Sequence, residues 1–134
     1  MTRIDIIDPK LLSREHLQSN LRELPRITNY IRKSLNTGKT INIPNEFTLG
    51  TGHVKWYYNK LKWVVNRYNR LCDEWRNRGY SDAIIRDDWL ILLCGIAPKE
   101  WWNDWEPTGK DISKNISRIN QRVVEFTNKK HKIT

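Results

Sequence analysis

Three observations predict an all-α fold for this chain. Segments 13–36, 52–78 and 111–128 carry apolar residues at the spacing of amphipathic helices. No segment alternates apolar and polar residues clearly enough to be a strand. A chain of 134 residues is also the size of one domain. We therefore expect one compact domain, residues 1–134, with three main helices, an extended N-terminal arm and long loops.

The chain begins with a segment that we expect to be an extended arm, residues 1–12. Asp8 precedes Pro9, and the residue before a proline disfavours the helical conformation. Ser13 can cap the next helix, which should end near Asn36, just before Gly38. One side of this helix is apolar and is expected to face the core. It consists of Leu17, Leu21, Leu24, Ile31 and Leu35.

The other side of this helix places one carboxyl group between two guanidinium groups. Glu23 is flanked by Arg22 and Arg26, which are i, i+4 neighbours, and His16 lies nearly in line with Glu23. Pro25 removes one backbone hydrogen bond and should kink the helix, at a cost of about 3 kcal/mol. Taken alone, this pattern is also typical of an ordinary solvated helix face.

A loop over residues 39–52 leads to the second helix, expected from about residue 52 to residue 78. Gly79 is the expected glycine after its C-terminus. Its apolar stripe predicts a core-facing side, and basic residues decorate the remainder. The stripe consists of Val54, Tyr57, Leu61, Val64, Tyr68, Leu71 and Trp75, and the basic residues are Lys55, Lys60, Lys62, Arg67, Arg70, Arg76 and Arg78.

The segment between the second and third helices is rich in tryptophan. Ser81 and Asp82 can cap a short helical stretch through Leu93, and residues 97–105 should form a turn and a short helix. Two interpretations of its three clustered tryptophans remain open. They pack in the core, or one of them stacks on a base or fills the space of a displaced base. These residues are Trp101, Trp102 and Trp105.

The third helix is expected over residues 111–128. Its apolar stripe should face the core, with Lys114, Arg118 and Arg122 on a different side. The stripe consists of Ile112, Ile116, Ile119, Val123 and Phe126.

The charge of the chain favours a polyanionic partner. Lysine and arginine outnumber acidic residues, which gives a net charge of +9 and a pI near 9.8. Nucleic acid is the first expectation and an acidic membrane surface the second. Many small basic proteins bind neither specifically, so the charge does not decide the function.

The remaining composition excludes several classes of site. Cys72 and Cys94 lack metal-ligand spacing and are expected to be reduced core thiols in a cytoplasmic protein. The three histidines suggest no metal site, and no cofactor is expected. The N-terminus lacks the pattern of a signal peptide, and no apolar run approaches the about 20 residues of a membrane span.

The first residues offer a nucleophile. Thr2 is small, which favours removal of Met1 and would leave a free threonine α-amine beside Arg3. The pKa of an α-amine is ordinarily about 7.7–8.0, and neighbouring cations lower it. A neutral amine can form an imine with an electrophilic carbon, and a glutamate nearby can move protons. Free threonine termini are common, so this pattern alone indicates little.

Several motifs, taken together and in order, carry a resemblance. They are Met1-Thr2-Arg3-Ile4, His16-Leu17, Arg22-Glu23-Leu24-Pro25-Arg26, Arg32-Lys33, Gly38-Lys39, Leu49-Gly50-Thr51-Gly52-His53-Val54, Tyr58-Asn59-Lys60-Leu61 and Arg78-Gly79-Tyr80. Through its first 80 residues the chain resembles the pyrimidine-dimer DNA glycosylase/abasic-site lyase family, the endonuclease V type of ultraviolet-repair enzyme. A short deletion near residues 41–46 is the only interruption.

This resemblance implies a set of site residues. The family's nucleophile falls on the α-amine of Thr2 and its essential glutamate on Glu23. His16 either positions sugar or phosphate or is a structural residue of the helix. Phosphate contacts are implied for Arg3, Arg22, Arg26, Arg118 and Arg122, with Lys33 and Lys39 further out. The implied partner is damaged double-stranded DNA, and no metal or cofactor is required. The sequence says little about oligomeric state, and a monomer is the default expectation.

The chain also departs from the family. The aromatic C-terminal tail that takes part in lesion recognition is absent, and residues 81–108 match poorly. Three hypotheses therefore stand: a dimer-specific glycosylase with lyase activity, the same chemistry on a different damaged or modified base, and a non-enzymatic basic DNA-binding protein. Glu23 between two arginines argues against the third, because a pure phosphate-binding face gains nothing from a carboxylate.

Overall fold

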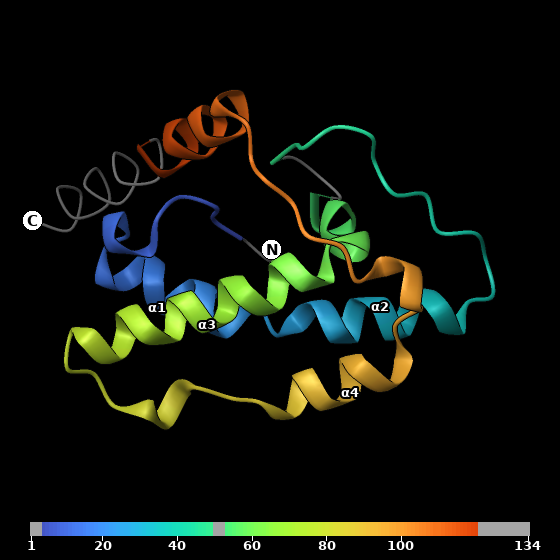
Figure 1. Cartoon of the computed structure of the whole chain (residues 1–134), viewed down its shortest axis with the longest axis horizontal. Coiled ribbons are helices and arrows are strands. Elements are labelled where there is room, and N and C mark those ends of the chain that lie inside the picture. The colour runs from blue at the N-terminus through green and yellow to red at the C-terminus, as the bar shows by residue number, and fades with distance from the viewer. Residues whose placement is uncertain (1–3, 50–52, 121–134) are drawn as a thin grey trace, which may run out of the picture.

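The computed structural model describes residues 4–49 and 53–120, and Figure 1 shows its helical architecture. The α-helices are α1 (Arg14–Glu23), α2 (Arg26–Asn36), α3 (Leu61–Asn77) and α4 (Asp88–Ile96), and residues 109–120 are also helical. Short 3-10 helices are η1 (Pro9–Leu11), η2 (His53–Asn59), η3 (Asp82–Ile84) and η4 (Lys99–Trp101). Within the described ranges no residue lies in a β-strand, and the prediction of an all-α fold is confirmed.

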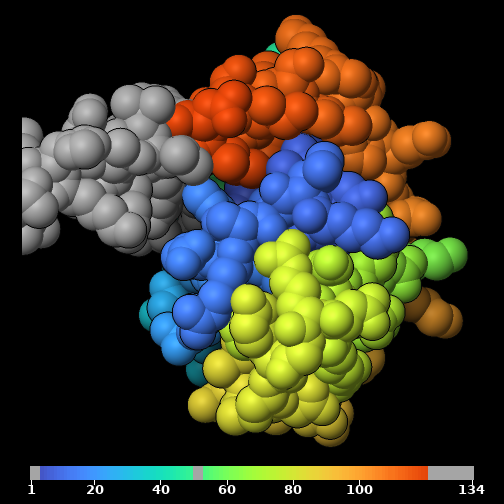
Figure 2. Space-filling model, turned by 90° about the vertical axis from the view of Figure 1, so that its left-hand side faces the viewer, coloured from blue at the N-terminus to red at the C-terminus, as the bar shows by residue number. Residues whose placement is uncertain are grey.

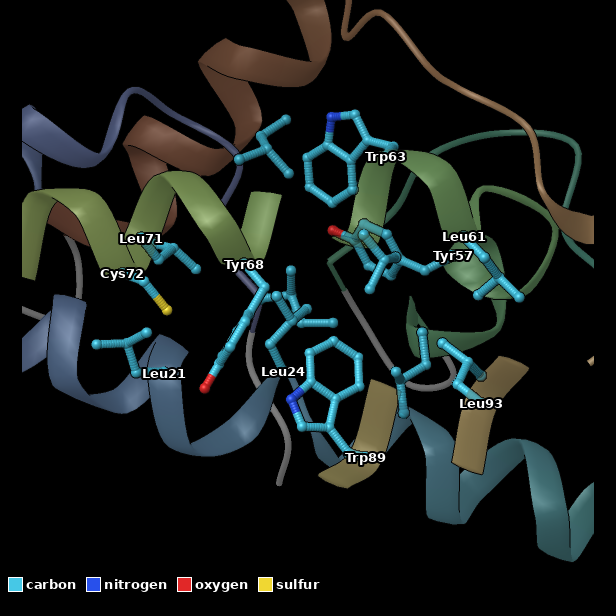
Figure 3. Packing of buried hydrophobic residues seen from close by; sticks show 14 of the residues in the cluster. Leu21, Leu24, Tyr57, Leu61, Trp63, Tyr68, Leu71, Cys72, Trp89 and Leu93 are labelled. Carbon is cyan, nitrogen blue, oxygen red and sulfur yellow. The ribbon is translucent and has the colours of Figure 1, made fainter. Parts of the chain in front are cut away.

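The helices enclose one hydrophobic core. α3 packs along α1, and α4 packs against α2 (Figure 1). In Figure 2 the N-terminal segment, in blue, lies between residues 109–120, in orange and red, and the end of α3, in yellow-green. Aromatic and leucine side chains from several elements meet in the centre (Figure 3). The largest fully buried side chains are Tyr57, Tyr68, Ile4, Leu17, Leu21, Leu24, Ile27, Ile31, Leu61, Leu71, Leu93 and Val64.

The prediction of a single helix over residues 13–36 is wrong, because the helix is interrupted at Pro25. α1 ends at Glu23, and Pro25 occupies the N-cap position of α2. Proline lacks an N–H group and cannot continue the hydrogen-bond ladder of α1. Leu24 is nevertheless fully buried at this corner. Leu35, expected in the core, is 37% exposed in the last turn of α2.

The second expected helix is shorter than its apolar stripe suggested. Residues 53–59 form a 3-10 helix, and α3 starts only after Lys60, whose φ of −130° interrupts the helix. Gly79 follows α3 with a φ of +83°, as expected for a glycine at this position. Arg67, expected on the solvated side, is instead only 2% exposed.

The second half of the chain differs from expectation in detail. Segment 82–93 contains η3 and then α4, which continues to Ile96. In helix 109–120, Ile112 and Ile116 are 36% and 42% exposed, whereas Asn115 is fully buried. The predicted apolar stripe therefore does not face the core, although Ile119 packs against it. Residues 121–128 of that expected helix lie outside the described residues.

Three smaller predictions can be compared with the structure. η1 replaces part of the expected extended arm, because Pro9 at the first position of a helical turn needs no N–H donor. Cys72 is buried, and burial raises the pKa of its thiol, but Cys94 is exposed and is not a core residue. Trp105 packs among Phe47, Trp56 and Trp63, which supports the core interpretation of this tryptophan.

Two absences hold for residues 4–49 and 53–120. None of the helices there combines the length and apolar character that crossing a membrane requires. In the same ranges, histidine, cysteine and acidic residues form no group of three or more that could hold a metal ion.

The buried corner at Leu24 predicts a large effect on stability. Leu24 is 0% exposed and belongs to the same buried cluster as Trp89 and Tyr68 (Figure 3). We expect Leu24→Ala to lower the free energy of unfolding by about 2–5 kcal/mol, because it leaves a cavity. Leu11→Ala is the matched control, since Leu11 is 71% exposed, and should change it by less than about 0.5 kcal/mol. Equal effects of the two substitutions in urea denaturation would contradict this packing.

Candidate functional site

The break between α1 and α2 presents polar side chains at the corner of the two helices. Glu23 is the last residue of α1 and is half-buried, while Arg22 and Arg26 on either side are exposed. The hydrogen bond from Leu24 N–H to the Asn20 carbonyl, 2.9 Å long, still closes the last turn of α1. Glu23 therefore lies at a well-defined helix end, with Arg22 before it and Arg26 at the start of α2.

A groove lies beside this corner. It has a volume of about 510 Å³ and separates the α1–α2 corner from the segment around η3 and the start of α4. Its lining combines apolar side chains with three arginines. The lining residues are Leu21, Arg22, Pro25, Arg26, Asn29, Ala83, Ile84, Arg86, Asp88 and Trp89.

Arg86 on the far wall of this groove was missed by sequence reasoning. Its N–H donates to the Tyr68 hydroxyl at 2.9 Å, and its carbonyl accepts from the Trp89 indole N–H at 3.0 Å. The rings of Tyr68 and Trp89 meet edge to face, with centroids 5.0 Å apart. The backbone N–H and carbonyl of Arg86 are therefore both hydrogen-bonded, while its side chain is exposed. The available signal was a basic residue that interrupts an otherwise apolar stretch.

His16 takes part in capping α1. Its Nδ1 lies 2.8 Å from the Ser13 hydroxyl, which also accepts the His16 backbone N–H at 3.2 Å. Ser13 is thus the N-cap that the sequence predicted. This contact supports the structural interpretation of His16 and leaves a role in DNA binding to the other ring nitrogen.

The N-terminal arm is tied to α1 one turn before Glu23. The Asp5 backbone N–H donates to the Asn20 side-chain oxygen at 2.8 Å, and the Asn20 amide donates to the Asp5 carboxylate at 2.7 Å. From Asp5 the chain returns to Ser13 at the start of α1, so the arm runs antiparallel to α1 (Figure 1). Asp5 is therefore held beside the last part of α1, one turn from Glu23.

The other expected phosphate contacts are spread over the surface. Lys33 is exposed on α2, two turns after Arg26 on the same side of the helix. Arg118 is half-buried and donates to the Leu49 carbonyl, so part of its guanidinium holds a loop. Lys114 holds the same loop through the Phe47 carbonyl at 3.2 Å. Thr2, Arg3 and Arg122 lie outside the described residues.

A comparison with known proteins connects this arrangement to a family. A family model described as pyrimidine dimer DNA glycosylase matches residues 1–87 of the 134 in the chain. The match spans the arm, α1, α2 and α3 together with Arg86, while helix 109–120 lies beyond it. Family membership implies a DNA substrate. The chain belongs to the pyrimidine dimer DNA glycosylase family.

Proposed function

We propose that this protein excises cyclobutane pyrimidine dimers from duplex DNA and then cleaves the resulting abasic site by β-elimination. The nucleophile is the α-amine of Thr2, exposed by removal of Met1. One observation carries this proposal. Asp5 of the arm is hydrogen-bonded to Asn20, which lies one helical turn before Glu23 on α1. Thr2 is three residues before Asp5 in the sequence, and this short separation from the hydrogen-bonded part of the arm supports the proposal.

The proposed chemistry has two steps. The neutral amine attacks C1′ of the damaged nucleotide, the glycosidic bond breaks, and the base leaves with the bonding electrons and takes up a proton. Opening of the sugar ring yields a protonated imine between Thr2 and C1′. A proton then leaves C2′ and the bond between C3′ and its phosphate oxygen breaks. Glu23 stabilises the cationic sugar and assists removal of the C2′ proton.

The arginine-lined groove supplies the proposed DNA contacts. Arg22 and Arg26 on one wall and Arg86 on the other offer phosphate-binding groups. The apolar side chains between them suit the face of a base displaced from the stack. A dimer weakens pairing and stacking, so that displacing a base at a lesion costs less than in intact duplex.

A second candidate keeps this chemistry and changes the lesion. The family model matches residues 1–87 only, so the remaining residues lend no support to the lesion that the family name gives. The same imine chemistry would then act on another damaged or modified base. Excision assays on duplexes with single defined lesions separate the two candidates.

Glu23→Gln tests the catalytic assignment. We expect the rate of strand cleavage at a cis-syn thymine dimer to fall by about 100-fold or more, because the amide cannot accept the C2′ proton. The dissociation constant for the same duplex should stay within about threefold, since phosphate contacts remain. Glu15→Gln, in the exposed first turn of α1, is the matched control and should behave as wild type. Cleavage by Glu23→Gln at the wild-type rate would contradict the assignment.

Arg86→Gln tests the far wall of the groove. If the Arg86 guanidinium neutralises one phosphate, its loss should reduce the slope of log K against log salt by about 0.9. Arg70→Gln provides the control, because Arg70 is exposed on α3 and does not line the groove. Binding titrations at several salt concentrations measure both slopes. Identical slopes for Arg86→Gln and wild type would remove Arg86 from the interface.

A further inference from the structure

A polar cluster is buried where three distant parts of the chain meet. Asp5, Asn20 and Asn115 are each no more than 1% exposed. The Asp5 carboxylate accepts one hydrogen bond from the Asn20 amide, at 2.7 Å, and one from the Asn115 amide, at 2.9 Å. The cluster thus joins the arm to both α1 and helix 109–120.

Asn115 holds the arm along its backbone as well. Its side-chain oxygen accepts the N–H groups of Ile6 at 2.8 Å and Ile7 at 3.3 Å. With the bond from Asp5 N–H to Asn20, three successive backbone N–H groups of the arm are bound by two asparagine side chains. Buried polar groups lose free energy when unpaired, so this arrangement fixes the arm in one register.

A buried cation accompanies the cluster. Arg67 of α3 is 2% exposed, and its guanidinium has no hydrogen-bond partner among the described residues. Burial lowers the pKa of Arg67 to about 10, while the charges of Asp5 and Asp8 oppose that decrease. Arg67 therefore stays charged at neutral pH, and Asp5 and Asp8 are the acidic groups whose charges favour that state. The other ionisable groups that influence this region are Tyr57, Arg70, Asp111 and Arg118.

We infer that Asp5, Asn20 and Asn115 are positioning residues, which hold the arm against α1 and helix 109–120 and thereby position the Thr2 amine for the proposed reaction. This inference rests on the proposed function. Asp5 is three residues from Thr2 along the arm, and Asn20 is one helical turn from Glu23 along α1. The polar cluster therefore joins the arm, which begins with the proposed nucleophile, to α1, which ends with Glu23. Asn115 contributes from a helix beyond the region that the family model matches.

A positioning role differs from a purely structural one in its effects on reaction rate and on DNA affinity. A loosened arm keeps the phosphate-binding arginines of α1 and α2, so that DNA affinity should be retained. The amine, however, would sample many positions, and misplacement of a reacting group by about 1 Å can cost about 100-fold in rate. Disruption of the polar cluster should therefore lower the rate of imine formation and leave DNA affinity unchanged.

Asn115→Asp tests this directly. The new carboxylate still accepts the Ile6 and Ile7 N–H groups but faces the Asp5 carboxylate without a donor. Two adjacent carboxylates raise the pKa of the pair, and protonation at low pH restores a donor. At saturating abasic duplex and about pH 8, we expect borohydride trapping to be about 10- to 100-fold slower than wild type. At about pH 5.5 the ratio of the two rates should recover to within about threefold.

Two further variants complete the experiment. Asn120→Asp makes the same substitution at an exposed position of the same helix and should trap at the wild-type rate. Asp5→Asn removes one acceptor without adding a titrating group, so its slower trapping should show no recovery at low pH relative to wild type. Circular dichroism and the dissociation constant for the abasic duplex are measured for every variant.

The possible outcomes distinguish a failure of this inference from a failure of the proposed function. Wild-type trapping rates in folded Asn115→Asp and Asp5→Asn would overturn the inference, as would losses matched by equal losses of DNA affinity or helicity. Absence of trapping by the wild-type protein would instead overturn the proposed function, and the inference with it. If Asn115→Asp does not fold, Asp5→Asn alone decides by the same comparison of trapping rate with affinity.

Discussion

The interruption of the helix at Pro25 is the constraint on which the rest of the site depends. A proline cannot donate to the ladder of α1, so the chain turns after Glu23 and restarts as α2 at Arg26. Leu24 enters the core at this turn and anchors it. The polar residues on either side are then held outward at a rigid corner. One wall of the groove is the direct product of this turn.

Charge has two distinct uses in this basic protein. Arg22, Arg26 and Arg86 are exposed beside a groove, and we propose that they bind phosphates there. Arg67 is buried, and the charge of Asp5 opposes the decrease in the pKa of Arg67 that burial causes. A net charge of +9 does not distinguish these uses, because it counts both kinds of arginine alike.

The sequence predicts the elements that depend on local chemistry. The cap at Ser13, the glycine at Gly79 and the buried leucines of α1 follow from residue type and spacing, and they occur as predicted. Burial of Arg67 and Asn115 could not be predicted in this way. Both are buried because distant parts of the chain supply their surroundings, and helical periodicity carries no information about such contacts. Arg86 was missed for the same reason, because the residues that line the groove with it, among them Arg22 and Arg26, are distant in the sequence.

The central claim is that the N-terminal amine forms a covalent bond with the damaged nucleotide. It is tested most directly by borohydride reduction of protein whose Met1 removal has been verified by mass, with peptide mass spectrometry locating the adduct. The duplexes carry a cis-syn thymine dimer, an abasic site or no lesion. Our account predicts an adduct on the peptide that begins at Thr2 with both damaged duplexes and none with the intact one. An adduct on a lysine side chain, or no adduct with either damaged duplex, would contradict it.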